Sequence, residues 1–144
     1  MSVNYKPAEY HTITPYLIVK GADKLISFLV DTFDAQQKMC MKDDDGSVRH
    51  AEIRIGDSLL MISEAREEFP ANDSMLHLYV PDVDATFARA IENGATSLRE
   101  PKDEVYGDRS AGVRDASGNQ WWMATHIEDV SPEEVENRYR EMES

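Results

Sequence analysis

The sequence contains the same series of secondary-structure signals twice, which restricts the folds that the chain can adopt. The interval from Val19 to Val80 differs by only one position from the interval from Gly56 to Gly118. In both halves the signals read as a strand, a helix and three further strands. A repeat of this length indicates duplicated supersecondary units that bury a shared face. The sequence therefore predicts an α+β fold built from two βαβββ modules.

The predicted elements form two modules and a tail within a single domain that spans residues 1–144. The first module covers about residues 10–64, with strands expected at 12–20, 37–42, 47–55 and 58–63 and a helix at 21–33. The second module covers about residues 75–127, with strands expected at 75–80, 97–99, 110–114 and 120–126 and a helix at 83–93. The polar segment between the modules is interpreted as a linker.

A third helix is expected at about residues 131–142. Ser131 suits the N-cap position, Pro132 suits the first helical position, and Glu134 completes a capping box. The residues that follow are nearly all polar. We therefore expect this helix to be peripheral or to pack on a partner subunit.

The charge balance limits the classes of partner. The chain has 28 acidic and 15 basic residues, which gives a formal net charge of −13. Nucleic acids and anionic membranes bind basic surfaces, so neither is expected as a partner. The acidic charge favours solubility and is compatible with a cationic ligand. No apolar run approaches the length of about 18 residues that a membrane span needs, and the N-terminal residues lack the apolar core of a signal peptide. We therefore expect a cytoplasmic protein.

Alternation along the strands sorts their side chains onto two faces of the sheet. One face is almost entirely apolar and is expected to lie under the helices. Its members are Leu17, Val19, Leu60, Ile62, Leu76, Leu78, Val80, Trp121 and Met123.

The opposite face mixes aromatic, thioether and polar side chains. It is expected to carry Thr14, Tyr16, Met61, Ser63, Met75, His77, Tyr79, Trp122, Ala124 and His126, and the third strand adds His50, Glu52 and Arg54. Such a face is typical of a small-molecule cavity, and equally of a half-exposed sheet or a dimer interface. The adjacent tryptophans are thus predicted to separate, with Trp121 under the helices and Trp122 on the mixed face.

Four stretches of this chain resemble one branch of a known superfamily. They read YHTITPYLIVKGAD, HAEIRIGDSLLM, LHLYVPDVDATFARAIENGAT and YGDRSAGVRDASGNQWWMATHIEDVSPEE. Together they are similar to the PhnB-like branch of the vicinal oxygen chelate superfamily, which includes glyoxalase I, extradiol dioxygenases and bleomycin-resistance proteins. The resemblance implies that the two modules form a curved mixed β-sheet around a cleft. It also implies a homodimer.

The resemblance implies positions for metal ligands, on the first and last strands of each module. Here those positions fall at or near Thr14, Met61, Met75 and Trp122, and none of these is a usual ligand for a divalent ion. We therefore expect no cofactor. The alternative is a divalent metal held by a displaced set of ligands, namely His77, His126 and Glu52.

The predicted ligand cleft consists of mixed-face residues from both modules. These are Thr14, Tyr16, Met61, Met75, His77, Tyr79, Trp122 and His126. The histidines could instead be structural.

Tyr106 and Arg109, in the motif YGDR, are candidates for the rim of the cleft. The glycine and aspartate between them could equally form a structural turn.

His50 and Glu52 have spacing suited to a two-ligand site. Alternatively, Glu52 pairs with Arg54 or Arg114 across the strands. His11 precedes the first strand and could reach the rim, although it is expected to be exposed.

The leading hypothesis is a dimer whose cleft binds a small organic molecule without the usual metal set. A second hypothesis is a metal-dependent lyase or isomerase of the glyoxalase type. A third is a structural or regulatory dimer with a filled cleft. The chain has no GxGxxG, Walker, GxSxG or HExxH motif, so nucleotide-binding and hydrolase functions have no support.

Overall fold

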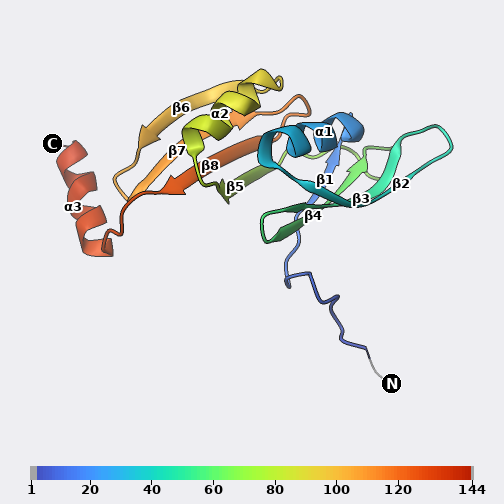
Figure 1. Cartoon of the computed structure of the whole chain (residues 1–144), viewed down its shortest axis with the longest axis horizontal. Coiled ribbons are helices and arrows are strands. Elements are labelled where there is room, and N and C mark those ends of the chain that lie inside the picture. Colours follow the sequence, from blue (N-terminus) through green and yellow to red (C-terminus); the bar gives the residue numbers. More distant parts are fainter. Residues whose placement is uncertain (1–2, 144) are drawn as a thin grey trace. The chain divides into compact units, whose positions relative to one another are not determined.

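The computed structural model describes residues 3–143. The strands are β1 (Tyr16–Val19), β2 (Gln36–Lys42), β3 (Val48–Ile55), β4 (Ser58–Glu64), β5 (Met75–Tyr79), β6 (Thr96–Asp103), β7 (Asp108–Arg114) and β8 (Gln120–His126). The helices are α1 (Ala22–Phe33), α2 (Val83–Glu92) and α3 (Pro132–Glu143) (Figure 1). Every predicted element is present, but two differ in length. The strand expected at 12–20 is shorter, because β1 begins at Tyr16 and Thr14 precedes it, and β6 is longer than the strand expected at 97–99.

The strands form two four-stranded sheets with the same topology. The first has the order β1-β4-β3-β2 and the second the order β5-β8-β7-β6. In each sheet the first strand of the module runs parallel to the last, and the other neighbours are antiparallel. The sheets belong to two compact units that divide after Ser74, with the turn at 116–118 grouped with the first unit. The predicted arrangement of two βαβββ modules is confirmed.

The register of the strands repeats as well as their order. Tyr16 pairs with Met61 across β1 and β4, and His77 pairs with Trp122 across β5 and β8. The sequence interval from Tyr16 to His77 equals the interval from Met61 to Trp122. The duplication inferred from sequence spacing is therefore a duplication of residue positions within the sheets.

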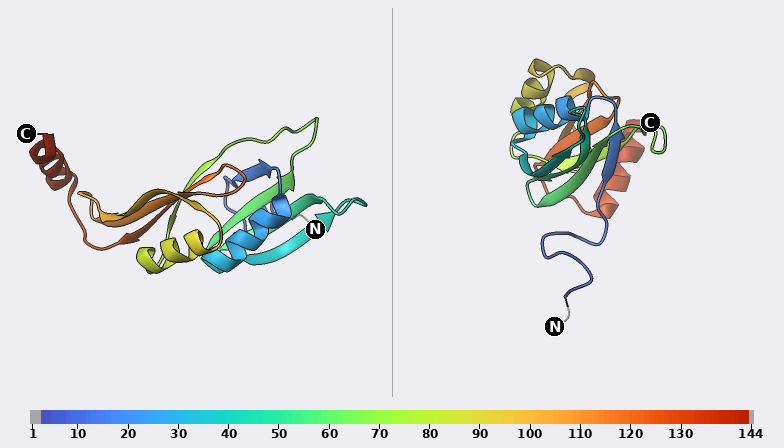
Figure 2. Two further views of the ribbon diagram at one scale, coloured as in Figure 1. Left: turned by 90° about the horizontal axis from the view of Figure 1, so that it is seen from above. Right: turned by 90° about the vertical axis from the view of Figure 1, so that its right-hand side faces the viewer.

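Each of α1 and α2 packs against the sheet of its own module (Figure 2). In the first module Leu17 and Ile62 are buried, and in the second Trp121 and Met123 are buried. The prediction for Trp121 is confirmed.

The edge strand β5 departs from this pattern, because Leu76, Leu78 and Val80 are only half-buried. Helix α2 packs on β6, β7 and β8 and leaves this edge less covered.

At the start of α1 and of α2, backbone N–H groups donate to a side chain on the last strand of the same module. The Glu64 carboxylate, at the end of β4, accepts from the backbone N–H groups of Gly21 and Ala22 at 2.9 and 3.0 Å. Thr125 in β8 accepts from the Val83 N–H at 2.9 Å. The sequence interval from Glu64 to Thr125 equals the interval from Ala22 to Val83. The free N–H groups at each helix start are thus satisfied at equivalent positions.

Helix α3 has no buried residue, as expected of a helix that is peripheral or packs on a partner subunit. The Ser131 hydroxyl accepts from the Glu134 N–H at 3.1 Å, as the capping motif predicts. The Arg138 guanidinium donates to the Val105 carbonyl at 3.0 Å and to Glu128 at 2.6 Å, which attaches the helix to the second module. Within residues 3–143 no helix is both long and apolar enough to cross a membrane.

The turn between β7 and β8 is organised by a buried carboxylate. Asp115 accepts from the Trp121 indole N–H at 2.7 Å, the Asn119 backbone N–H at 3.0 Å and the Asn119 amide at 3.2 Å. Asp115 is 6% exposed and Asn119 is fully buried. A single side chain therefore satisfies three donors that have no access to water.

Replacing this carboxylate tests its contribution to stability. Asp115→Ala leaves the buried Trp121 and Asn119 donors without an acceptor, and we expect unfolding to become easier by about 2–3 kcal/mol. Urea denaturation followed by far-UV circular dichroism measures the change. Asp57→Ala is the matched control, because Asp57 lies in an exposed turn and accepts from the neighbouring Ser58 hydroxyl. Equal losses from both variants would contradict this role of Asp115.

Candidate functional site

The mixed face of the first module carries a chain of polar contacts. The Tyr16 hydroxyl and His50 Nδ1 are hydrogen-bonded at 3.0 Å, and His50 Nε2 and Glu52 are hydrogen-bonded at 3.2 Å. The strand register places Glu52 beside Met61, and Met61 beside Tyr16. The four side chains therefore form a connected surface across β1, β4 and β3.

A pocket of about 450 Å³ opens over this surface. Glu52 of β3 and Met61 of β4 line it from the sheet, and the other lining residues, Thr14 among them, precede β1. Residues 5–12 are called the N-terminal strap below. The strap residues that line the pocket are Tyr5, Lys6, Pro7, Tyr10, His11 and Thr12.

Ion pairs attach the strap to the sheet. Glu9 pairs with Arg54 of β3 at 3.0 Å and with Lys38 of β2. The expected pairing of Glu52 with Arg54 is therefore wrong, because Arg54 turns to the strap. The attachment brings residues far from β3 in sequence onto the mixed face.

Tyr10 and Glu52 meet at the wall of the pocket. Burial and the neighbouring Glu52 carboxylate raise the pKa of Tyr10 to about 12, so its hydroxyl stays protonated. Hydrogen bonding from Tyr10 and from His50 lowers the pKa of Glu52 against the opposing effect of burial. At neutral pH the pocket therefore contains an ionised carboxylate beside a neutral phenol.

On the mixed face of the second module, an indole ring lies across a glycine. Trp122 pairs with Gly112 across β8 and β7, and a Cβ atom on Gly112 would meet the indole at 2.6 Å. The Arg99 guanidinium lies 5.2 Å from the centre of the ring, and the indole N–H donates to Gln120 at 3.0 Å. The absent side chain at Gly112 thus permits the contact between Trp122 and Arg99.

A methyl group at Gly112 tests this arrangement. Gly112→Ala should displace the Trp122 ring from Arg99 and cost about 1–3 kcal/mol of stability through overpacking. Near-UV circular dichroism reports the ring, and urea denaturation reports the stability. In a Trp122→Ala background the same substitution should cost much less, because the clashing ring is gone. An equal cost in both backgrounds would show that the ring does not occupy the space above Gly112.

His126 lies between two aspartates at the end of β8. Its Nδ1 is 2.8 Å from Asp108, its Nε2 is 2.7 Å from Asp129, and the Tyr79 hydroxyl donates to Asp108 at 2.9 Å. Asp108 is 3% exposed, whereas Asp129 lies in an exposed loop. The hydrogen bond to Asp108, and then that to Asp129, raises the pKa of His126. Both ring nitrogens are therefore engaged within the protein.

This network predicts a pH dependence of stability. The folded protein holds the His126 proton more tightly than the unfolded chain, whose imidazole has the ordinary pKa of 6.5. The stabilisation is therefore complete below that value and is lost as pH rises through the higher pKa of the folded state. Urea denaturation from about pH 5 to about pH 9 should show this loss, and His126→Asn should remove it. His11→Asn is the control, and an unchanged pH profile in His126→Asn would contradict the assignment.

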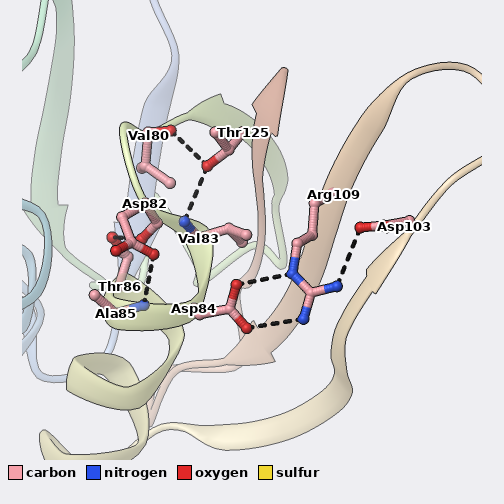
Figure 3. A network of polar contacts seen from close by, with 9 residues as sticks. All are labelled: Val80, Asp82, Val83, Asp84, Ala85, Thr86, Asp103, Arg109 and Thr125. Carbon is pink, nitrogen blue, oxygen red and sulfur yellow. Dashed lines mark hydrogen bonds and ion pairs between the residues drawn. The ribbon is translucent and has the colours of Figure 1, made fainter. Parts of the chain in front are cut away.

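The predicted rim residue Arg109 lies on the other side of its sheet. Its guanidinium donates to both oxygens of Asp84 at 2.8 and 2.9 Å and to Asp103 at 3.1 Å (Figure 3). Arg109 pairs with Thr125, whose hydroxyl binds the start of α2 on the helix side. Arg109 thus ties α2 to β6 and β7. Tyr106 is 38% exposed in the preceding turn.

The positions implied for metal ligands do not fit a divalent ion. Thr14, Met61, Met75 and Trp122 offer a hydroxyl, two thioethers and an indole, rather than imidazoles and carboxylates.

The displaced set of His77, His126 and Glu52 is divided between the modules. His77 on β5 and His126 at the end of β8 belong to the second module, where His77 is paired with Trp122 rather than with His126. Glu52 belongs to the first module. Across residues 3–143 no group of three or more histidine, cysteine, aspartate or glutamate side chains is arranged to hold a metal ion.

The predicted cleft residues lie on the mixed faces of their own modules. Thr14 and Met61 line the pocket, and Tyr16 connects to it through His50. Along β5, Met75 is 70% exposed and Tyr79 is 65% exposed. His77 contacts the Tyr79 ring with 5.1 Å between ring centres.

The sequence indicated that His11 could reach the rim, and His11 lines the pocket. It did not indicate that the rest of the strap lines the pocket or that Arg99 contacts Trp122. A glycine inside a strand often marks a close approach by another group. Gly112 could therefore have indicated that a neighbouring side chain, here the Trp122 ring, packs against the backbone at this position.

Comparison with known proteins identifies the family. The Glyoxalase/Bleomycin resistance protein/Dioxygenase superfamily matches this sequence over residues 10–123. An uncharacterized protein of Mycobacterium bovis, Mb0911c, is 31% identical over 147 residues, which cover 94% of each chain. This protein therefore belongs to the Glyoxalase/Bleomycin resistance protein/Dioxygenase superfamily.

Two solved structures share the fold at lower identity. TnmS3, an antibiotic binding protein from Streptomyces sp. CB03234, matches with a TM-score of 0.64 and 24% identity, over 84% of this chain and 99% of that one. A PhnB protein from Bacillus cereus matches with a TM-score of 0.65 and 17% identity, over 80% of this chain and 99% of that one. At these identities the similarity establishes the fold alone.

Proposed function

We propose that this protein binds a small organic molecule on the mixed faces of its modules and does so without the metal-ligand set of the family. The proposal depends on the residue types at the two equivalent strand pairs, called the repeated row, which lie at the same register position in both modules. Tyr16 and Met61 occupy this row in the first module, and His77 and Trp122 occupy it in the second. Aromatic rings and thioethers bind organic molecules through stacking and dispersion.

The pocket of the first module supports binding rather than a filled face. Its volume of about 450 Å³ falls within the range of about 300–1,000 Å³ that is usual for small-molecule sites. The antibiotic binding protein TnmS3 has the same fold, which is consistent with the binding of a small molecule. The net charge of −13 favours a neutral or cationic molecule over an anion.

A homodimer of the PhnB-like branch, located in the cytoplasm, completes the proposal. Met75 and Tyr79 on β5 are large and exposed, and the apolar residues on the other face of this edge strand are only half-buried. Such an edge is suited to cover by a second copy. The acidic charge argues against nucleic acid or an anionic membrane as the partner.

Tryptophan fluorescence tests the proposal, because Trp121 is buried and Trp122 lies on the mixed face. Titration with bleomycin and with neutral and cationic planar aromatic compounds should give a saturable response from at least one ligand. Trp122→Phe should remove most of that response, and Ile91→Ala, on α2, should leave it unchanged. Binding should persist in EDTA, because no metal is required. A response that is retained in full by Trp122→Phe would refute the assignment.

A further inference from the structure

The pocket under the N-terminal strap contains a carboxylate without a lysine or arginine partner. The Glu52 side chain is 23% exposed, and its hydrogen bond to His50 is 3.2 Å long. Among residues 3–143, no lysine or arginine lies within ion-pair distance of Glu52, although Arg54 lies close by on the same strand. Arg54 and Lys38 are drawn to Glu9 instead, and Lys38 acts on Glu52 only from farther away. An ionised carboxylate in a half-enclosed site is costly unless a charge or several donors compensate for lost water.

The groups around Glu52 are suited to a cation. The Tyr10 hydroxyl is buried beside Glu52, and its hydrogen bonding to the carboxyl lowers the pKa of Glu52. Thr12 and Thr14 add two further hydroxyl oxygens at the pocket wall. The Lys6 ammonium donates to the Tyr10 carbonyl within the strap itself. The ammonium group of a bound ligand could therefore donate hydrogen bonds to the Glu52 carboxylate and to neutral hydroxyl groups in this pocket.

The rest of the pocket is suited to an apolar body. Met61 forms part of the floor, and Tyr5 and Pro7 form part of the outer wall. An amine with an attached aromatic or alkyl group would place its charge at Glu52 and its apolar part against these side chains. A carboxylate in the same position would be repelled by Glu52.

We infer that the strap pocket is a binding site for organic ammonium ions, in which Glu52 pairs with the cation and Tyr10 positions the Glu52 carboxylate. This inference rests on the proposed small-molecule function and adds the class of ligand and the part of the chain that selects it. The strap is then a wall of the site as well as an N-terminal extension of β1. Its ion pairs through Glu9 hold Tyr10 over Glu52.

Three probes of similar shape separate charge recognition from simple apolar binding. These are phenethylammonium, neutral phenethyl alcohol and anionic hydrocinnamate. Amide chemical shifts in two-dimensional NMR locate the binding, and calorimetry measures the affinity. We expect phenethylammonium to shift the amides of Tyr10, Glu52 and Met61 and to bind at least about tenfold more tightly than the alcohol, as a charge-assisted hydrogen bond provides. Hydrocinnamate should bind most weakly.

Substitutions assign the effect to single groups. Glu52→Gln should weaken phenethylammonium binding by at least about tenfold and leave the alcohol within about twofold. Glu92→Gln makes the same change of charge at the exposed end of α2 and should have no effect. Tyr10→Phe removes the hydroxyl that positions Glu52 and should weaken ammonium binding by about fivefold, while the affinity for the alcohol stays within about twofold.

Each outcome decides between the inference and the broader proposal. Equal affinity for ammonium and alcohol in the strap pocket would overturn the ammonium class and leave small-molecule binding intact. A response at Trp122 without shifts at Tyr10 and Glu52 would overturn the strap site alone. If Glu52→Gln does not fold, the comparison of the three probes on the unaltered protein still decides the inference.

Discussion

In each module the first strand lies parallel to the last, and the positions of the other strands and of the helix follow from this pairing. Parallel neighbours cannot be joined by a tight turn, so the chain must cross over through the helix and two further strands. The crossover places the helix on one face and leaves the other face open. Since Tyr16 pairs with Met61 and His77 with Trp122, the open face presents equivalent rows in both modules. The hydrogen bonds that the helix starts donate to the last strands secure the same crossover twice.

The open faces have diverged although their backbones repeat. In the first module Glu52 stands beside Met61, and in the second Gly112 stands at the corresponding place beside Trp122. The carboxylate adds a charged group to the pocket under the strap, whereas the glycine makes room for an indole and an arginine. A duplicated scaffold thus presents two chemically different surfaces, and the positions implied for a metal carry no imidazole or carboxylate in either. Charge recognition and aromatic stacking are the means of binding that these side chains offer.

The polar clusters differ in what they hold together. The contact of Arg109 with Asp84 and Asp103 joins a helix to two strands on the covered side (Figure 3). The contact of His126 with Asp108 and Asp129 joins the end of β8 to the loop that leads to α3. The second includes an imidazole whose pKa is raised by its hydrogen bonds to Asp108 and Asp129. A change of pH that titrates His126 therefore alters contacts at the C-terminal end of the second module.

The sequence by itself determined the repeat, the order of the elements and the separation of Trp121 from Trp122, because alternation and helical spacing are local properties of the chain. It also showed that the implied ligand positions lack conventional metal ligands, since the residue types at Met61 and Trp122 are visible without coordinates. Only the tertiary structure decided which groups meet Glu52. Tyr10 is distant from Glu52 in sequence and precedes the first strand, and Arg54, the nearer candidate, is paired with Glu9. Contacts of this kind depend on how a segment without regular structure crosses a sheet, and no periodicity records that path.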